Sequence, residues 1–139
     1  MKDGIHLEIA TAGGSVYDDM VSYVELPLSG GSVGVLQDHA PMLGAVESGV
    51  VTARKSDGTE AFIAVDLGVA NVVHNEATLL VRTAERAENI DLPRAEAALR
   101  RAESDLEARG MEMNVSTAEA AQERARARIR AVALWRKNG

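Results

Sequence analysis

Residues 78–99, TLLVRTAERAENIDLPRAEAAL, divide the chain into two parts that favour different secondary structure. Upstream of Ala84 the sequence consists of short apolar runs separated by turn residues. From Ala84 onward Ala, Arg and Glu dominate, and these are strong helix formers. Asp91 can cap a helix whose first turn tolerates Pro93. We therefore expect a β-domain over residues 1–86 and a helical segment over residues 87–139.

The upstream part predicts many short strands. Ile5, Leu7 and Ile9 alternate with polar residues, which is the pattern of a half-buried strand. Asp57-Gly58 predicts a hairpin because glycine tolerates a positive φ, and His74-Asn75-Glu76 predicts a second one. The other segments that look extended are 16–26, 33–36, 50–54, 61–65, 69–73 and 78–83. Strands this short, at this spacing, indicate a sandwich or a barrel.

The downstream part predicts two helices, over about residues 91–109 and 116–137. Gly110 suits the end of the first helix, and Ser116-Thr117-Ala118-Glu119 reads as a capping box that opens the second. Two helices joined by a short loop pack as an antiparallel hairpin. Apolar residues spaced three or four apart form the expected seam: Leu92, Ala95, Leu99, Ala102 and Leu106, then Ala118, Ala121, Ala125, Ile129 and Val132. Because alanine buries little area, this hairpin should be marginally stable and able to detach.

Composition and charge exclude several classes of function. Aromatic residues make up only 3% of the chain, and the net charge is −6, so neither base stacking nor attraction to phosphate backbones favours nucleic-acid binding. The charge is uneven: residues 1–89 carry 5 Lys and Arg against 13 Asp and Glu, whereas residues 90–139 carry 10 against 8. The two parts therefore present different surfaces to partners.

Enzyme and metal chemistry find no support in the sequence. There is no cysteine, and His6, His39 and His74 are far apart without a second ligand nearby, so neither a thiolate nor a histidine metal site is expected. No Gly-Lys-Ser or Gly-Lys-Thr phosphate loop is present, and no nucleophile has a placed base. The N-terminus lacks the apolar core of a signal peptide, and no apolar run approaches the roughly 18 residues of a membrane span. We expect a non-catalytic protein that reaches a membrane only through a partner.

The arginines of the helical part are the most informative polar residues. Arg94 and Arg101 are seven residues apart and so share one helix face, while Arg124 and Arg128 are four apart on the second helix. Closing the hairpin would bring the four guanidinium groups near one another, where an anion or carboxylates would be needed among them. Taken alone, the pattern favours an ordinary solvated helix face with pairs such as Glu96–Arg100.

Two segments resemble a known family. Residues 31–43, GSVGVLQDHAPML, are similar to the His-Ala-Pro-Leu-Leu signature of the epsilon subunit of F-type ATP synthase. Residues 90–95, IDLPRA, are similar to the Ile-Asp-x-x-Arg-Ala motif of its nucleotide-binding bacterial members. The order of strands and helices agrees over the whole length. The chain departs from the family at Gln37-Asp38, where Pro-Gly is usual, and at Asp66-Leu67-Gly68, where paired glycines are usual.

The resemblance implies a β-sandwich that docks on the gamma subunit and the c-ring, followed by a mobile hairpin that inhibits ATP hydrolysis when extended. The loop from Gly30 to Met42 would contact the c-ring or gamma subunit, through Ser32, His39, Ala40, Pro41 and Met42. The extended hairpin would reach the beta and alpha subunits. Its contact with an acidic loop of the beta subunit would be made by Arg124, Arg126, Arg128 and Arg130. The subunit would be a peripheral part of F1 on the cytoplasmic face of the cell membrane.

The resemblance also implies a regulatory ATP site in the compact hairpin, with no other cofactor. Glu85 and Asp91 would orient the adenine end, and Ile90 would also belong to the site. Arg94 and Arg101 of the first helix, with Arg124 and Arg128 of the second, would hold ribose and phosphates. Because of this match, we interpret the arginines as part of a ligand site rather than as a solvated helix face. Two alternatives stay open: a structural coupling subunit that binds no nucleotide, and a free-standing nucleotide-binding module.

Overall fold

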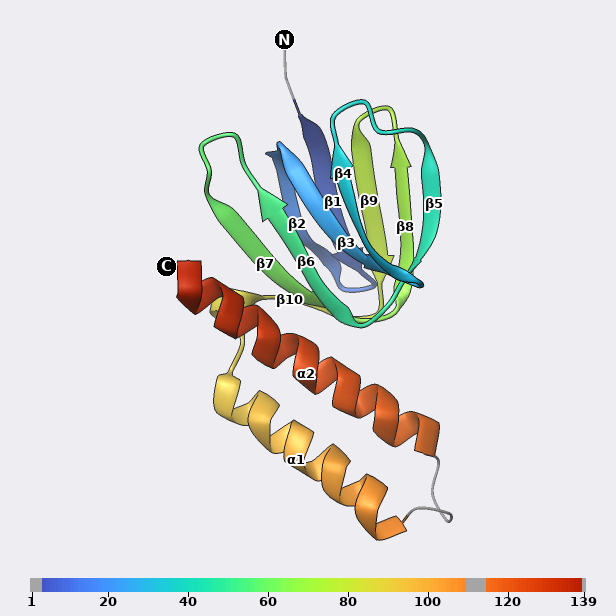
Figure 1. Ribbon diagram of the computed structural model, residues 1–139, viewed down its shortest axis with the longest axis vertical. Helices are drawn as coiled ribbons and strands as arrows, with labels where there is room; N and C mark the ends of the chain where they lie inside the picture. The colour runs from blue at the N-terminus through green and yellow to red at the C-terminus, as the bar shows by residue number, and fades with distance from the viewer. Residues whose placement is uncertain (1–3, 110–114, 139) are drawn as a thin grey trace.

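The computed structural model describes residues 4–109 and 115–138, which form a β-domain and a pair of antiparallel helices (Figure 1). The predicted fold class, a β-sandwich followed by a helical hairpin, is confirmed. The strands are β1 (Ile5–Thr11), β2 (Gly14–Val21), β3 (Tyr23–Leu28), β4 (Gly31–Leu36), β5 (Met42–Val46), β6 (Gly49–Arg54), β7 (Glu60–Val65), β8 (Gly68–Val73), β9 (Glu76–Val81) and β10 (Ala84–Arg86). A 3-10 turn, η1 (Ala87–Asn89), leads to α1 (Leu92–Arg109) and α2 (Val115–Asn138).

The strands run in the order β10-β7-β6-β3-β5-β8-β9-β1-β2, with β4 paired to β3. A single residue pair, Leu28 with Val46, joins β3 to β5, so the sheet turns there and the strands divide into two layers. At the far ends, Arg86 of β10 donates a hydrogen bond from Nε to the carbonyl oxygen of Val16 in β2, at 2.9 Å. The same guanidinium lies 5.0 Å from the ring centre of Tyr17, so β10 ties the edge of one layer to the other.

The core lies between these layers and consists almost entirely of aliphatic residues. Strand β1 contributes the alternating set that the sequence predicts, since Ile5, Leu7 and Ile9 have no exposed surface. Its position explains this burial, because β1 pairs antiparallel with β2 and parallel with β9. Further buried members come from the other strands: Val24, Leu26, Val35, Val46, Val51, Ile63, Val72 and Leu79.

Both predicted hairpin turns are present. Asp57-Gly58 connects β6 to β7, and Gly58 adopts a φ of 90°. His74 and Asn75 connect β8 to β9 with φ values of 50° and 62°, the left-handed pair typical of a two-residue hairpin turn. The extended run expected over residues 16–26 is wrong in one respect, because it breaks at Ser22 between β2 and β3.

The segment between Ala84 and Asn89 contains a strand that the sequence analysis did not predict, although it placed Ala84 to Arg86 in the β-domain. Its composition favours a helix, yet Ala84, Glu85 and Arg86 form β10, in register with Val65, Ala64 and Ile63 of β7. Here the free backbone edge of β7 outweighs local propensity, which is a weak influence. The expected cap of α1 is confirmed: the backbone N–H of Arg94 donates to Oδ1 of Asp91 at 3.1 Å. Helix α2 begins at Val115, one residue before the predicted capping box, while Gly110 falls outside the described residues.

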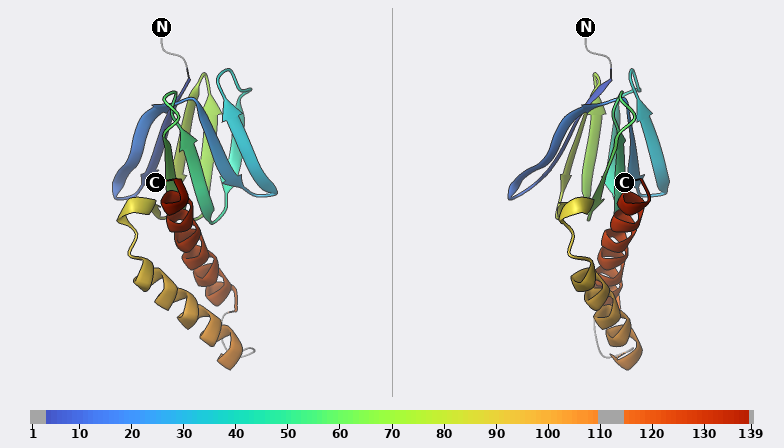
Figure 2. Two further views of the ribbon diagram at one scale, coloured as in Figure 1. Left: turned by 60° about the vertical axis from the view of Figure 1, so that its left-hand side comes forward. Right: turned by 90° about the vertical axis from the view of Figure 1, so that its left-hand side faces the viewer.

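Helix α2 lies between α1 and the β-domain (Figures 1 and 2). Ala127 and Ala131 are buried in a small cluster with Phe62 and Ala64 of β7. The expected seam residues Ala118, Ala125 and Val132 are also buried, but they lie outside that cluster at seven-residue spacing, so we assign them to the contact with α1. Helix α2 therefore has two buried faces, of which the sequence analysis identifies one. No helix of the described residues is long and apolar enough to cross a membrane.

Candidate functional site

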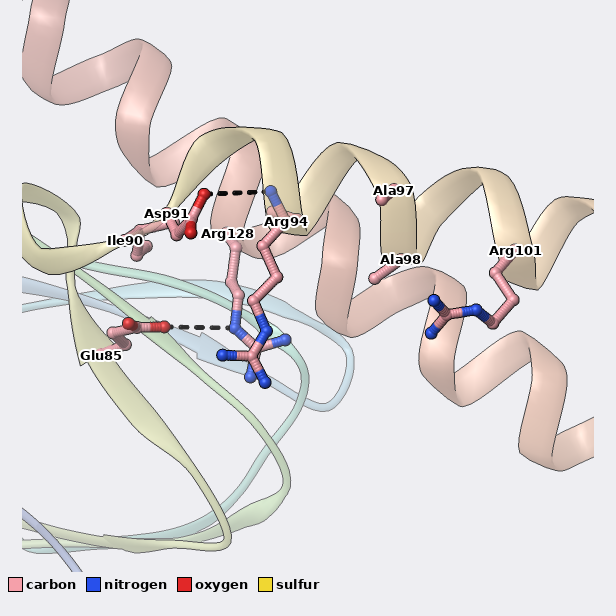
Figure 3. Close-up of a pocket in the computed structure, with 9 residues that line it drawn as sticks. Glu85, Ile90, Asp91, Arg94, Ala97, Ala98, Arg101 and Arg128 are labelled. Atoms are coloured by element: carbon pink, nitrogen blue, oxygen red, sulfur yellow. Dashed lines mark hydrogen bonds and ion pairs between the residues drawn. The ribbon is translucent and has the colours of Figure 1, made fainter.

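A pocket of about 550 Å³ lies where the segment joining the two domains meets both helices (Figure 3). Six of the seven residues expected at the ligand site line it: Glu85, Ile90, Asp91, Arg94, Arg101 and Arg128. Ala95, Ala97 and Ala98 supply the rest of the wall. The short alanine side chains leave the space open between the helices, so the alanine-rich sequence of α1 is what makes the pocket.

Local structure fixes the acidic end of the pocket. Strand β10 holds Glu85 opposite Ala64 of β7, and the η1 turn then carries the chain to Asp91. Oδ1 of Asp91 accepts the backbone N–H of Arg94, so its carboxylate is committed to the first turn of α1. This bond also fixes the backbone of Arg94 in the first turn of α1.

The basic side chains reach the pocket from two helices. Figure 3 shows Arg94 of α1 and Arg128 of α2 extending toward the same point beside Glu85, with Arg101 farther along α1. Nε of Arg128 lies 3.4 Å from Oε1 of Glu85. Among the described residues, no ion pair is found for Arg94 or Arg101. Three guanidinium groups therefore face two carboxylates, which leaves an excess of positive charge suited to an anion.

Arg124, the seventh expected residue, lines an adjoining pocket of about 230 Å³ that shares Glu85 and Arg128 with the first. Its Nη1 lies 3.9 Å from Oδ2 of Asp66, a carboxylate in the β7–β8 connection. Arg124 and Arg128 therefore both point toward the β-domain, one helical turn apart.

The four arginines expected at an inhibitory contact do not share one face. Arg124 and Arg128 face the β-domain as just described, whereas Arg126 and Arg130 are exposed. Among the residues that the structure describes, the one ion pair found for Arg126 is with Glu123, three residues before it on the same helix, at 3.3 Å. In the compact arrangement, Arg124 and Arg128 therefore already pair with carboxylates of the β-domain.

The residues of the expected contact loop do not all lie together: Ser32 is paired with Pro27 near the start of β4, whereas His39, Ala40 and Pro41 follow the end of that strand. Ser32 is on β4, Met42 opens β5, and His39, Ala40 and Pro41 connect the two strands. Asp38 has a φ of 66°, which explains how it can replace the glycine usual in the family, since Asp tolerates this conformation better than most residues. The Asp38 N–H donates to Oδ1 of Asn75 at 2.6 Å, so the loop is fixed to the β8–β9 turn.

One surface feature was not expected from the sequence. An exposed apolar patch over β8 and β9 is lined by Leu67, Val69 and Leu80, and Leu80 is 56% exposed. Farther along the same sheet, Leu43 of β5 is 77% exposed. The signal for this patch was the unbroken apolar run Leu79-Leu80-Val81, because continuous runs indicate a strand that is apolar on both faces.

Residues 4–87 match the β-sandwich domain of the ATP synthase delta/epsilon chain, and residues 88–133 match its long α-helix domain. The chain belongs to the ATP synthase delta/epsilon chain family. Its relatives include the ATP synthase epsilon chains of several Staphylococcus aureus strains, among them JH9, Newman and N315. Each is 40% identical over 131 residues, covering 94% of this chain and 97% of the relative. The resemblance to epsilon subunits is thereby confirmed.

Two solved ATP synthases contain chains with the same fold as this epsilon-type chain. One, from the Euglena gracilis mitochondrial ATP synthase, a structure of its OSCP, F1 and c-ring, superposes with a TM-score of 0.81 at 18% identity, covering 96% of this chain and 83% of the other. The other, from the central stalk and c-ring of the Tetrahymena thermophila mitochondrial enzyme, gives a TM-score of 0.56 at 10% identity, covering 96% and 97%. Among the described residues of the epsilon-type chain, no group of three or more acidic or histidine side chains could hold a metal ion.

Proposed function

We propose that this chain is a non-catalytic central-stalk subunit of a bacterial F-type ATP synthase whose C-terminal hairpin binds ATP and regulates ATP hydrolysis. The observation that carries the ATP proposal is the pocket between the helices and the domain junction. Residues up to 43 positions apart in the sequence, from Glu85 to Arg128, meet there. Residues that the sequence analysis could group only by their spacing thus line one pocket, which carries an excess of positive charge.

The chemistry of the pocket suits a nucleoside triphosphate. Arg94, Arg101 and Arg128 offer planar forks that bind phosphate oxygens in pairs. At the junction end, Ile90 supplies apolar surface for a base, while Glu85 and Asp91 supply acceptors for its amino group or for ribose hydroxyls. A triphosphate would neutralise the excess positive charge between the helices.

The pocket also gives a physical basis for regulation. Its lining comes from α1, α2 and the junction, so it exists only while the hairpin is closed. A ligand shifts a two-state equilibrium only through different affinities for the two states, and a site split between two helices meets that condition. ATP would therefore favour the compact hairpin, and loss of ATP would release α2 toward the beta and alpha subunits.

The β-domain supplies the proposed docking surfaces. The apolar patch over β8 and β9 and the exposed loop after β4 would contact the gamma subunit and the c-ring. The two solved complexes with similar folds are named for F1 or the central stalk together with the c-ring, which supports this placement. Exposed apolar patches on small domains often mark such contacts. The chain would then lie at the cytoplasmic face of the cell membrane as part of F1, held there by these partners.

A coupling subunit without nucleotide binding is the second candidate. It is favoured by the ion pairs Glu85–Arg128 and Asp66–Arg124, which already give two of the arginines carboxylate partners without a ligand. A free-standing nucleotide-binding module is disfavoured because both domains match the ATP synthase family.

Calorimetric titration with ATP and GTP separates the two candidates. Trp135 provides a second readout, because it lies on α2 beside Phe62 and the β6–β7 turn, where movement of α2 would change its fluorescence. We expect saturable ATP binding with a fluorescence change, weaker GTP binding, and a large loss of affinity in Arg94→Ala and in Arg124→Ala. Absence of heat at millimolar ATP would reject the sensing role and leave the coupling subunit.

A further inference from the structure

Asp66 is the one buried charged or polar residue identified in the core of the described chain, with 2% of its surface exposed. It lies between β7 and β8, in the segment where the chain departs from the paired glycines of the family. Its backbone N–H donates to the carbonyl oxygen of Thr83 at 2.9 Å, so its position is fixed relative to β10.

The two carboxylate oxygens of Asp66 are in different situations. Oδ1 accepts a hydrogen bond from the hydroxyl of Ser48 at 2.7 Å. Oδ2 is buried and has no hydrogen-bond partner among the described residues. The one cation found in ion-pair contact with it, within the described part of the chain, is Arg124 of α2, whose Nη1 lies 3.9 Å away. A buried carboxylate with an unsatisfied oxygen is costly, and a nearby guanidinium reduces that cost.

This pair is matched by a second pair one turn farther along α2. Arg128 lies 3.4 Å from Glu85 of β10, and Arg124 and Arg128 are four residues apart on one helix face. The two acids come from neighbouring segments of the β-domain. The apolar contact beside them rests mainly on small side chains, since α2 contributes Ala127 and Ala131 to it, with the half-buried Leu134 packed against them. Charge is therefore well placed to add to a weak apolar attachment.

We propose that Asp66 is a positioning residue that holds Arg124, and with it helix α2, on the β-domain when no ligand is bound. Asp66 is not part of the pocket that would hold ATP, so this role is separate from ligand binding. It acts on the same hairpin movement as the proposed function, but it requires no nucleotide. The compact form of this chain would consequently have a stability of its own, which a ligand increases.

Amide hydrogen exchange of the full chain without nucleotide tests this role. Arg124→Gln leaves the buried Asp66 carboxylate without its cation, so the exchange of α2 amides should accelerate by about tenfold. Asp66→Asn removes the charge and keeps an acceptor for Ser48, so its effect should be smaller. The double variant should resemble Asp66→Asn, because removing the carboxylate rescues the loss of the arginine. Arg126→Gln is the matched control, since Arg126 is exposed and its ion pair in the described part of the chain lies within α2.

Two results would overturn the proposal: equal exchange in Arg124→Gln and Arg126→Gln, or a double variant that exchanges faster than Arg124→Gln. If Asp66→Asn does not fold, Arg124→Lys replaces it, and equal exchange in the Lys and Gln variants would be the contrary result. If α2 opens only when the whole chain unfolds, the same order of variants should appear in the β-domain amides. Failure of ATP to bind would leave all of these comparisons unchanged, so the two proposals fail separately.

Discussion

Oε1 of Glu85 and Nε of Arg128 lie 3.4 Å apart, so one ion pair joins the last strand of the β-domain to the second helix. Glu85 directly follows the first residue of β10, and Arg128 is on the face of α2 that points toward the sheet. The same two side chains line both pockets. The contact that closes the hairpin onto the β-domain is thus also the contact that a ligand would meet.

Replacing Glu85 with Gln should separate phosphate binding from nucleotide recognition. The change frees Arg128 and makes the pocket more positive, so inorganic tripolyphosphate should bind about three- to tenfold more tightly. ATP should gain less affinity, because the neutral amide of Gln is a weaker acceptor at the base end than the carboxylate of Glu85. Calorimetry with both ligands measures this, and equal gains for the two would contradict the role of Glu85 at the adenine end.

Arg101→Ala should weaken ATP binding by about tenfold or more, because a hydrogen bond to a charged group contributes about 1.5–3 kcal/mol. The fold should be nearly unaffected, since no ion pair of Arg101 is found in the described chain. Arg100→Ala is the matched control: it removes the same charge from the exposed neighbour that does not line the pocket. If the two variants lose ATP affinity equally, the pocket is not the binding site.

Leu80→Asp tests the exposed apolar patch. Leu80 is already half-exposed, so the monomer should keep its stability, whereas binding to the purified gamma subunit should weaken by at least tenfold. Thr78→Asp provides the control, because Thr78 lies on the same strand with an exposed side chain but outside the patch. Unchanged affinity of the Leu80 variant in surface plasmon resonance would exclude this patch from the interface.

Gly68→Ala should destabilise the β-domain by about 2–4 kcal/mol. A Cβ at this position would lie 2.1 Å from the carbonyl oxygen of Leu80 and 2.6 Å from Cα of Val81, and both are backbone atoms of the paired strand. Gly13→Ala should change stability by less than about 0.5 kcal/mol, because its Cβ would meet only the hydroxyl of Thr11 at 3.5 Å. Denaturant unfolding of the two variants gives the comparison, and similar midpoints would disprove the close approach of β8 and β9.

His6 should titrate above its ordinary pKa of 6.5. Its hydrogen bond to Asp18 is the largest cause of the raised pKa, and Glu76 and Glu8 add to it, against a smaller opposing effect of burial. Because the folded state binds the proton more tightly, the stabilisation is complete below pH 6.5 and disappears as the pH rises through the raised pKa. The stability difference between the wild type and His6→Gln should therefore be larger at pH 5.5 than at pH 8.5.

An NMR titration of the His6 ring checks the same prediction directly. In Asp18→Asn the pKa of His6 should fall toward 6.5, because the hydrogen bond to the Asp18 carboxylate, the largest cause of the raised pKa, is removed. A pKa that stays unchanged in this variant would contradict the assignment.

Local signals explain what the sequence could predict of the fold. The turns at Asp57-Gly58 and at His74-Asn75 depend on residues that tolerate positive φ, so short-range chemistry is enough to locate them. Strand β10 could not be found in this way. Its residues are helix formers, and their conformation is decided by the edge of β7, more than 15 residues away in the sequence. Non-local pairing of this kind leaves no mark in composition.

For the candidate site, spacing predicted which arginines share a helix face, and the structure brings six of the seven expected residues into one pocket. Spacing could not predict that Arg124 and Arg128 would meet carboxylates of the β-domain. It also placed Ala127 and Ala131 outside the expected stripe, although both are buried. Both omissions have one cause: helical periodicity describes a helix with one partner, and α2 has two.

The parallel pairing of β1 with β9 has a consequence for biosynthesis. The first strand acquires its second neighbour only after the ribosome has produced residues 76–81, so the β-domain forms late and nearly all at once. Both helices are complete 57 residues after the end of β9, at Asn138. Helix α2 follows the β-domain in the chain and thus emerges after the surface that receives it, so its docking requires no rearrangement of the strands.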